Sequence, residues 1–388
     1  MHFLVKRLIL LLFLVAIFGV RTLSARPDDR KQQINTIVTK DVKPGDPGLA
    51  VLVKRNGTLL FQRGFGVRRL GEPDTITPDT NFRLASVTKQ FTALAILLLV
   101  HDGKLRYETT LTEIFPGFPA YGKAITVRHL LTHTSGLPDY EELMDQEEKV
   151  HGPRWSPERQ IQDDEVLALL KKETKGKFAP GTSWAYSNSG YVVLGLVIAT
   201  VSGTSYDEYL RQHIFAPLRM DHTLVYLKGK NDVSLRAYGH SPEHGKFTGT
   251  DQSATSATLG DGGIYANLED LSKWDDALKN HTLLPEREMQ AALTPVKLGD
   301  GRKTHWPLEP GGDNLAPGKP VSYGFGWFLD SYQAHPRMWH SGSTMGFRNV
   351  IERFTADGLT VIVLCNRADL QPESIALQIA DLYLGKAK

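Results

Sequence analysis

The chain has 388 residues, of which 41% are hydrophobic and 23% are charged, the proportions of an ordinary globular protein. The 45 Lys and Arg residues are balanced by 43 Asp and Glu residues, and the formal charge of +2 argues against a nucleic acid or an acidic surface as the partner. The single cysteine, Cys365, excludes an internal disulfide and a cysteine-based metal cluster, and its apolar surroundings at 361–365 indicate a buried thiol.

The first 25 residues have the layout of a secretory signal peptide. Lys6 and Arg7 precede an apolar run from Leu8 to Val20, and Ser24 and Ala25 are small residues suited to cleavage. The alternative is a retained membrane anchor, but the run is shorter than the about 20 apolar residues that span a bilayer. We therefore expect a mature chain, residues 26–388, that is periplasmic or secreted and has no stable membrane span. The oligomeric state is left open.

Two strands joined by a tight turn are predicted next. The strand-like runs 49–54 and 58–61 flank Asn56-Gly57, a pair that accepts the positive φ angles of a hairpin turn. A short apolar segment at 82–84 then leads into a helix predicted over 87–100, which Gly103 ends. A helix this apolar is expected to be buried.

The middle of the chain is rich in helix signals. Helices are predicted over residues 127–131, from the residue after Asp163 or Asp164 to Leu170, and over 188–201 and 206–214. Thr126, either Asp163 or Asp164, and Ser205 are placed to cap three of them.

The last part of the chain returns to strands. They are predicted over residues 323–329, 338–341, 347–354 and 359–365, and a helix over 373–384 follows. Strands near both ends with helices between them predict an α+β fold, in which an antiparallel β-sheet flanked by helices joins the two termini. The sheet lobe is expected at about 46–100 and 321–388, and a largely helical second lobe at about 105–320.

Ser86 is the candidate nucleophile because Lys89 follows three residues later. Positions i and i+3 share one face of a helix, so the amine is expected beside the hydroxyl. A serine attacks only when a neighbouring base takes its proton, and a lysine serves as that base when burial disfavours its charged form. A Ser-x-x-Lys pattern also arises by chance about once in a chain this long, but here it stands between a short strand and a buried helix.

Two further motifs can complete such a site. Tyr186-Ser-Asn188 offers a phenol that relays a proton and an amide that holds a carbonyl or the lysine. His340-Ser-Gly342-Ser343 lies on a predicted strand, where Gly342 lets substrate backbone approach and the N–H of Ser343 joins that of Ser86 as an oxyanion donor.

Two other patterns are better explained by structural roles than by catalysis or metal binding. Tyr265-Ala-Asn267 repeats the Tyr-x-Asn spacing, but Asn267 is well placed to cap a helix from Leu268 and Tyr265 to pack in the preceding strand. His129 and His133 have the i, i+4 spacing of a helical zinc pair, yet Leu130 occupies the place of the expected glutamate, so a hydrogen-bonding structural role is favoured. The chain also lacks the Gly-x-Ser-x-Gly nucleophile elbow of an α/β-hydrolase.

Taken in order, the three motifs resemble those of the serine β-lactamase and penicillin-binding protein superfamily, specifically the class C β-lactamase-like esterases and D,D-peptidases. The flanking segments agree as well, at 129–138, 190–195 and 262–265, and the resemblance runs from Gly48 to the C-terminus. It implies a β-lactamase/transpeptidase-like fold that needs no metal or cofactor.

The resemblance also implies a role for each residue. Ser86 is the nucleophile that becomes acylated, and Lys89 and Tyr186 share the general acid and base work. Asn188 contacts the substrate amide. The strand with His340, Gly342 and Ser343 lines the substrate site, with Ser86 and Ser343 supplying the oxyanion N–H groups.

One departure from the family pattern bears on the substrate. Many β-lactamases of this type have Lys-Thr-Gly where this chain has His340-Ser-Gly342. A histidine is mostly neutral at pH 7, whereas a lysine is cationic and suits a substrate carboxylate. Efficient β-lactam turnover is therefore disfavoured unless Arg348 supplies the missing cation. The function expected is a serine hydrolase acting through an acyl-enzyme on a small ester, a D-amino-acid peptide (as a carboxypeptidase) or, weakly, a β-lactam. The alternative is a non-catalytic penicillin- or peptidoglycan-binding protein with the same fold.

Overall fold

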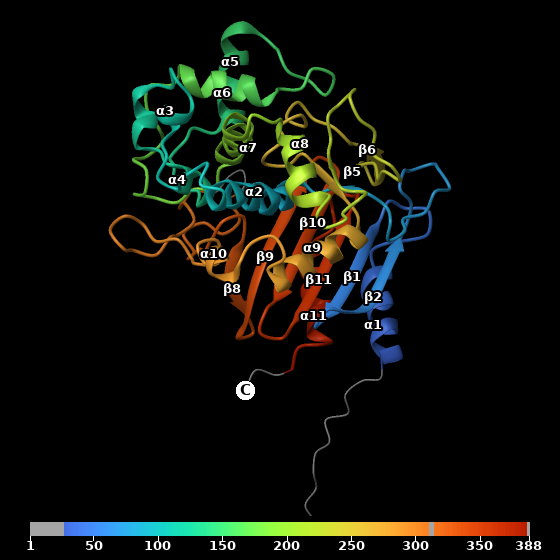
Figure 1. Cartoon of the computed structure of the whole chain (residues 1–388). Helices are drawn as coiled ribbons and strands as arrows, with labels where there is room; N and C mark the ends of the chain where they lie inside the picture. Colours follow the sequence, from blue (N-terminus) through green and yellow to red (C-terminus); the bar gives the residue numbers. More distant parts are fainter. Residues whose placement is uncertain (1–26, 310–313, 386–388) are drawn as a thin grey trace, which may run out of the picture.

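The computed structural model describes residues 27–309 and 314–385, so the predicted signal peptide at 1–25 lies outside the described residues. A central antiparallel sheet carries helices on both faces, and a mainly helical part lies above one end of it (Figure 1). The strand order is β2-β1-β11-β10-β9-β8. The strands of this sheet are β1 (Leu49–Arg55), β2 (Thr58–Phe65), β8 (Phe328–Tyr332), β9 (His335–Thr344), β10 (Phe347–Phe354) and β11 (Leu359–Cys365).

The sheet joins the two ends of the described chain, as predicted. β1 pairs with β11, so that Leu49 lies opposite Cys365. The predicted hairpin is confirmed, because Asn56 and Gly57 have φ angles of 51° and 83° between β1 and β2. The predicted bounds of the strands at 347–354 and 359–365 are those of β10 and β11. The α+β architecture is therefore confirmed.

The strand predicted at 323–329 is wrong in position. β8 begins only at Phe328, and the residues before it run in an irregular path with Gly326 at φ +75°. A Cβ on Gly326 would stand 2.7 Å from the carbonyl oxygen of Lys89 and 2.9 Å from the Cα of Gln90. This segment therefore turns away from the sheet to pack closely against the next helix, α2 (Lys89–His101).

Two hydrophobic cores lie on opposite faces of the sheet. Ala50 and Leu52 of β1 belong to the larger core with α2 and α9 (Leu268–Asn280), whereas Leu49, Val51 and Val53 belong to the second core. That alternation is the two-residue period of a strand buried on both sides. The second core is covered by α11 (Pro372–Asp381) and by α1 (Pro27–Thr39), which the sequence analysis did not predict. α11 ends three residues before the predicted 384.

The helical part contains most of the predicted helices. Its helices are α3 (Leu111–Ile114), α4 (Val127–Leu131), α5 (Tyr140–His151), α6 (Asp163–Lys172), α7 (Asn188–Ser202), α8 (Tyr206–Leu210) and α10 (Glu286–Met289), with 3-10 turns at Ala120–Ala124 and Ala85–Thr88 and a π turn at Arg211–Phe215. Small strands accompany them: β3 (Phe82–Arg83), β4 (Leu224–Val225) and β7 (Ile264–Ala266) in one sheet, and β5 (His240–Glu243) with β6 (Lys246–Gly249) in another.

Two of the predicted helix caps are confirmed and one is wrong. Thr126 caps α4 and Asn267 caps α9 through their side chains, as predicted. The cap assigned to Asp163 or Asp164 is wrong, because Gln162 is the N-cap of α6 and forms a capping box with Glu165. The two aspartates then lie in the first turn, where a negative charge still favours the helix.

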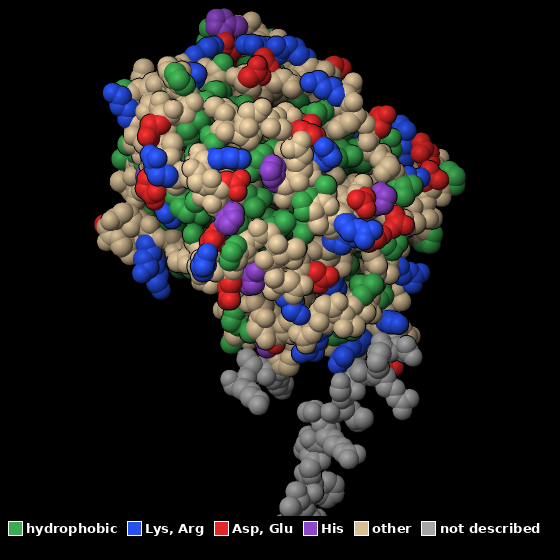
Figure 2. Space-filling model, viewed as in Figure 1, with side chains coloured by type: hydrophobic (Ala, Val, Ile, Leu, Met, Phe, Trp, Pro, Cys, Tyr) green, Lys and Arg blue, Asp and Glu red, His purple; other side chains and the backbone are tan. Residues whose placement is uncertain are grey.

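The surface has no region dominated by one sign of charge in the view of Figure 2, where Lys and Arg side chains alternate with Asp and Glu. This agrees with the near-neutral formal charge of +2. Within residues 27–309 and 314–385, no single helix is long and apolar enough to cross a bilayer. The bent helix pair Asn188–Ser202 and Tyr206–Phe215 reaches the required length and hydropathy only when its two helices are counted together.

Candidate active site

Ser86 lies in the 3-10 turn Ala85–Thr88, between β3 and α2. The predicted helix from residue 87 therefore begins two residues later as an α-helix, and Ser86 precedes its first turn rather than lying in it. Ala85 has a φ of +49°, a left-handed conformation that costs a residue with a side chain about 1–2 kcal/mol. The strained turn leaves Ser86 half-buried while its neighbours Ala85 and Val87 are buried.

Lys89 is buried and directed at Ser86. Its Nζ donates to Ser86 Oγ at 2.9 Å, to Asn188 Oδ1 at 2.8 Å and to the backbone oxygen of Asp261 at 3.1 Å. The side chain has no exposed area, so these oxygens replace the water that an ammonium group would otherwise bind. The structure thus brings the predicted pair together with Asn188, which is 99 residues away in sequence.

Tyr186 and Asn188 lie at the entrance to α7. Ser187 is the N-cap of this helix, and its Oγ accepts a hydrogen bond from Gly190 N at 3.1 Å. The side chain of Asn188 is therefore not the cap, and it points at Lys89 instead. The ring centroid of Tyr186 is 4.9 Å from Lys89 Nζ. Both predicted side chains are half-buried and reach the same amine.

Gly342 brings β9 against the turn that carries Ser86. A Cβ on Gly342 would lie 2.1 Å from the carbonyl oxygen of Leu84 and 3.2 Å from the backbone N of Ser86. We expected this glycine to make room for substrate backbone, and that reason is wrong, because the space is filled by the nucleophile turn. Ser343, the next residue on β9, is exposed beside this contact.

His340 is a buried, neutral histidine. Its Nε2 lies 3.0 Å from the Tyr323 hydroxyl and its Nδ1 lies 2.6 Å from the backbone oxygen of Ser341. A carbonyl oxygen only accepts, so Nδ1 carries the proton and Nε2 accepts from Tyr323. Burial, and then the charge of Lys89, lower the pKa of His340 to about 3. At neutral pH this ring therefore offers no positive charge to a substrate.

Arg348 does not supply that charge either. Its guanidinium donates to the backbone oxygens of Thr344 and Phe347 at 2.7 and 2.8 Å, which secures the turn between β9 and β10. Burial lowers its pKa, while the carboxylates of Glu373 and Asp369 oppose that shift. Glu373 belongs to α11 on the far face of the sheet. The prediction that Arg348 replaces the family lysine is therefore wrong.

Two contributors to the site were not predicted from the sequence. The backbone oxygen of Asp261 accepts a hydrogen bond from Lys89 Nζ, and a backbone acceptor cannot be predicted from a pattern of side chains. His133 was considered only as a zinc ligand or a structural residue, yet its ring centroid is 4.4 Å from that of Tyr186. The two histidines that were considered as zinc ligands bind backbone N–H groups instead. Nδ1 of His129 accepts a hydrogen bond from Thr126 N, and Nδ1 of His133 accepts one from Ser187 N. No group of three or more metal-binding side chains occurs in the described part of the chain.

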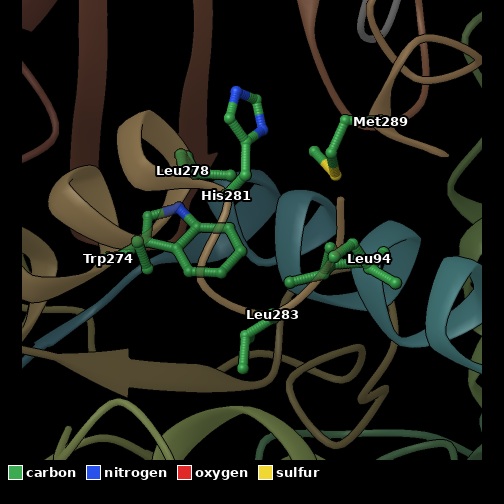
Figure 3. A pocket seen from close by; sticks show the side chains of 8 residues that line it. Leu94, Trp274, Leu278, His281, Leu283 and Met289 are labelled. Carbon is green, nitrogen blue, oxygen red and sulfur yellow. The ribbon is translucent and has the colours of Figure 1, made fainter. Parts of the chain in front are cut away.

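Two cavities lie away from these residues. The one in Figure 3 lies between α2 and α9, where Leu94, Trp274 and Leu283 enclose about 10 Å³, too little for any substrate. A larger cavity of about 500 Å³ lies against the sheet and is lined in part by Arg337, Met338 and Arg353. Neither is lined by Ser86, Lys89 or Tyr186.

Comparison with known proteins agrees on one family. A family model described as Beta-lactamase matches residues 34–384. Penicillin-binding protein 4* of Bacillus subtilis (strain 168) is 31% identical over 348 residues, which cover 86% of this chain and 71% of that relative. Protein flp of Staphylococcus aureus (strain MW2) is 28% identical over 350 residues, which cover 87% of this chain and 64% of the relative.

Solved structures give the same result. The octameric penicillin-binding protein homologue from Pyrococcus abyssi aligns with a TM-score of 0.73 and 27% identity, covering 92% of this chain and 77% of that one. The D-amino acid amidase from Ochrobactrum anthropi SV3 aligns with a TM-score of 0.73 and 23% identity over 92% of this chain and 97% of its own. At that identity the second likeness concerns the fold alone.

Proposed function

Since the chain belongs to the beta-lactamase family, we propose that it is a serine hydrolase which cleaves ester or amide bonds through an acyl-enzyme on Ser86. The observation that carries the proposal is the 2.9 Å contact between Lys89 Nζ and Ser86 Oγ. A base within this distance of a hydroxyl is positioned for proton transfer. A surface lysine matched by chance would point into solvent, whereas Lys89 is enclosed.

The hydrogen-bond partners of Lys89 support its role as the base. A neutral amine has two hydrogens and one lone pair. When the Asn188 amide oxygen and the Asp261 carbonyl oxygen accept both hydrogens, the lone pair points at the Ser86 hydroxyl. The amine then takes the hydroxyl proton while Oγ bonds to the acyl carbon. The proton passes, with the help of Tyr186, to the leaving group as its bond to that carbon breaks, and water later releases the acyl group.

The negative oxygen formed on attack needs donors that are already in place. The backbone N–H groups of Ser86 and Ser343 are proposed for this task, and the tight contact of Gly342 with Ser86 supports it because it sets the strand directly against the turn. Within the described residues, β8 pairs with β9 only as far as Trp339. The edge of β9 from His340 onward is thus open to an extended substrate, which can add its own backbone hydrogen bonds.

The electrostatics of the site favour a substrate without a carboxylate. His340 is neutral and both of its ring nitrogens are engaged, while Arg348 holds a backbone turn. Neither residue is placed to pair with the carboxylate of a cephalosporin or of a peptide that ends in D-alanine. We therefore propose neutral esters or amides as the better substrates.

Labelling with a fluorophosphonate tests the nucleophile. One label is expected on Ser86, and Ser86→Ala is expected to lose both the label and the hydrolysis of a p-nitrophenyl ester. Lys89→Met keeps the packing of a buried chain but removes the base, so its labelling should slow strongly. Ser205→Ala, at an exposed serine whose side chain makes no cap hydrogen bond, is the matched control. Intact wild-type protein without label would support the non-catalytic binding alternative.

A substrate panel tests the proposed substrate class. A p-nitrophenyl acetate, N-acetyl-D-phenylalanine amide, a chromogenic cephalosporin and a D-alanyl-D-alanine peptide are compared by kcat/KM. The kcat/KM of the neutral substrates should exceed that of the carboxylate substrates by at least about tenfold. That factor corresponds to about 1.4 kcal/mol, roughly the contribution of one charge-assisted contact that the carboxylates lack here. A cephalosporin that labels Ser86 without turnover would instead indicate a penicillin-binding role.

A further inference from the structure

His133 holds the segment that carries Tyr186 on both sides of that residue. Ala185 N donates to the backbone oxygen of His133 at 3.0 Å, and Ser187 N donates to its ring Nδ1 at 3.1 Å. Tyr186 lies between these two anchors in a stretch with no helix or strand of its own. A loop residue obtains a fixed position only from such external contacts, and here one histidine provides both.

The ring of His133 also packs against the Tyr186 ring and is enclosed by further aromatic side chains. The ring centroids of His133 and Tyr186 are 4.4 Å apart and tilted by 34°. Trp184, Tyr191 and Tyr323 enclose the remaining sides at 4.6 to 5.7 Å. With 1% of its surface exposed, His133 has little freedom to move, so it transmits a fixed position to the tyrosine.

The burial of His133 preserves the form of the ring that this contact needs. Ser187 N–H is a donor, so Nδ1 must be unprotonated. Burial, and then the charge of Lys89, lower the pKa of His133 well below its usual value, which keeps the ring neutral. A protonated ring would lose the bond to Ser187.

Two features argue against a residue kept only for packing. His133 has a φ of +59°, a left-handed conformation that is unfavourable for a side chain of this size. Its Nε2 has no hydrogen-bond partner among the residues that the structure describes. An apolar residue would avoid both the unpaired nitrogen and its desolvation cost. The hydrogen bond that Nδ1 accepts from Ser187 N is therefore the contact that favours a histidine at this position.

We propose that His133 is a positioning residue that fixes the Tyr186 phenol beside Lys89 and Ser86. This inference rests on the proposed hydrolase function and adds a residue that acts through Tyr186 rather than on the substrate. Its loss should slow the acylation of Ser86 by about 100-fold, which a misplacement of about 1 Å can cost.

The test compares two amides that place their acceptor differently. His133→Asn has a side-chain oxygen near the position of Nδ1 and accepts a positive φ well, whereas His133→Gln is closer to histidine in volume but carries its amide near the position of Nε2. We expect His133→Asn to keep kcat within about fivefold and His133→Gln to lose about 100-fold. His129→Gln is the matched control, since its ring Nδ1 caps α4 at Thr126 rather than holding Tyr186.

A double-mutant cycle with Tyr186→Phe separates positioning from general stability. If His133 acts through the phenol, His133→Gln has little further effect on kcat once that phenol is absent. Full additivity, or a His133→Gln enzyme as fast as wild type, would overturn the inference while leaving the hydrolase proposal intact. Wild-type protein that is neither labelled nor active would refute the proposed function itself. Should His133→Gln fail to fold, the test rests on His133→Asn. A loss of about 100-fold in the kcat of that variant would overturn the inference as well.

Discussion

Replacing Gly342 by alanine should separate the strand β9 from the turn that carries Ser86. The new Cβ would lie 2.1 Å from the Leu84 carbonyl oxygen, whereas real Cβ contacts are essentially never shorter than 3.0 Å. Both contacting groups are backbone, so neither can rotate away. The strand and the turn must therefore move apart by about 1 Å, which displaces the N–H of Ser343 relative to that of Ser86.

The cost of this displacement divides between stability and rate. Overpacking by one methyl typically costs about 1–3 kcal/mol of unfolding free energy, less than the about 5–15 kcal/mol that keeps a domain folded. The protein should therefore remain folded. A 1 Å misplacement of the oxyanion donors should slow acylation by about 100-fold, so activity is expected to fall far more than stability.

The assay is the second-order rate at which a fluorophosphonate labels Ser86, measured beside urea unfolding of the same samples. Gly262→Ala is the matched control, because its Cβ would meet the same turn at Ala85 but at 3.6 Å, an ordinary contact. It should label within about threefold of wild type. If folded Gly342→Ala labels as fast as Gly262→Ala, the strand does not position the reacting groups and the reasoning is refuted.

Two further predictions concern a helix cap and a histidine. Asn267→Ala removes a buried cap, in which Oδ1 accepts from Asp270 N at 2.9 Å, and should lower the free energy of unfolding in urea by about 1–2 kcal/mol. Ser205→Ala, at the N-cap of α8 but without a side-chain bond, should change it by less than about 0.5 kcal/mol, and equal effects would contradict the cap assignment. Because burial lowers the pKa of His340 to about 3, the ring is neutral throughout the range from pH 5 to 8 and should add no inflection to kcat/KM there. A depressed histidine pKa also means that its contribution to stability is present above the unfolded pKa of about 6.5 and is lost as the pH falls toward the folded value. An acid limb near pH 6.5 that disappears in His340→Gln would show that the ring titrates in the site.

Features that depend on near neighbours were readable from the sequence. β11 is an almost entirely apolar strand and β10 begins and ends with Phe; both have the predicted bounds, and Asn56-Gly57 makes the hairpin, because strand periodicity and turn chemistry act over a few residues. Ser86 and Lys89 face each other for the same reason, since three residues of a helical turn separate them. The family resemblance extended this to Tyr186 and Asn188.

One error of the strand prediction lies where distant segments meet. The strand expected at 323 starts late because Gly326 packs on α2. The errors at Arg348 and at the cap of α6 are local instead, because Arg348 donates to Thr344 and Phe347 in its own turn and Gln162 forms the capping box with Glu165. The contact of Gly326 leaves no periodic pattern, because it depends on which backbone the fold brings alongside.

The sequence alone thus determined the chemistry available to this protein: a serine, a lysine at helical spacing, a phenol and an amide. Only the tertiary structure decided how they are held. Lys89 takes its acceptors from residues 99 and 172 positions away, and His133 holds the segment around Tyr186 through Ala185, 52 positions away, and Ser187, 54 positions away. Short-range propensity cannot specify contacts of that range, because they form only when packing of the buried helices and the sheet closes the intervening chain.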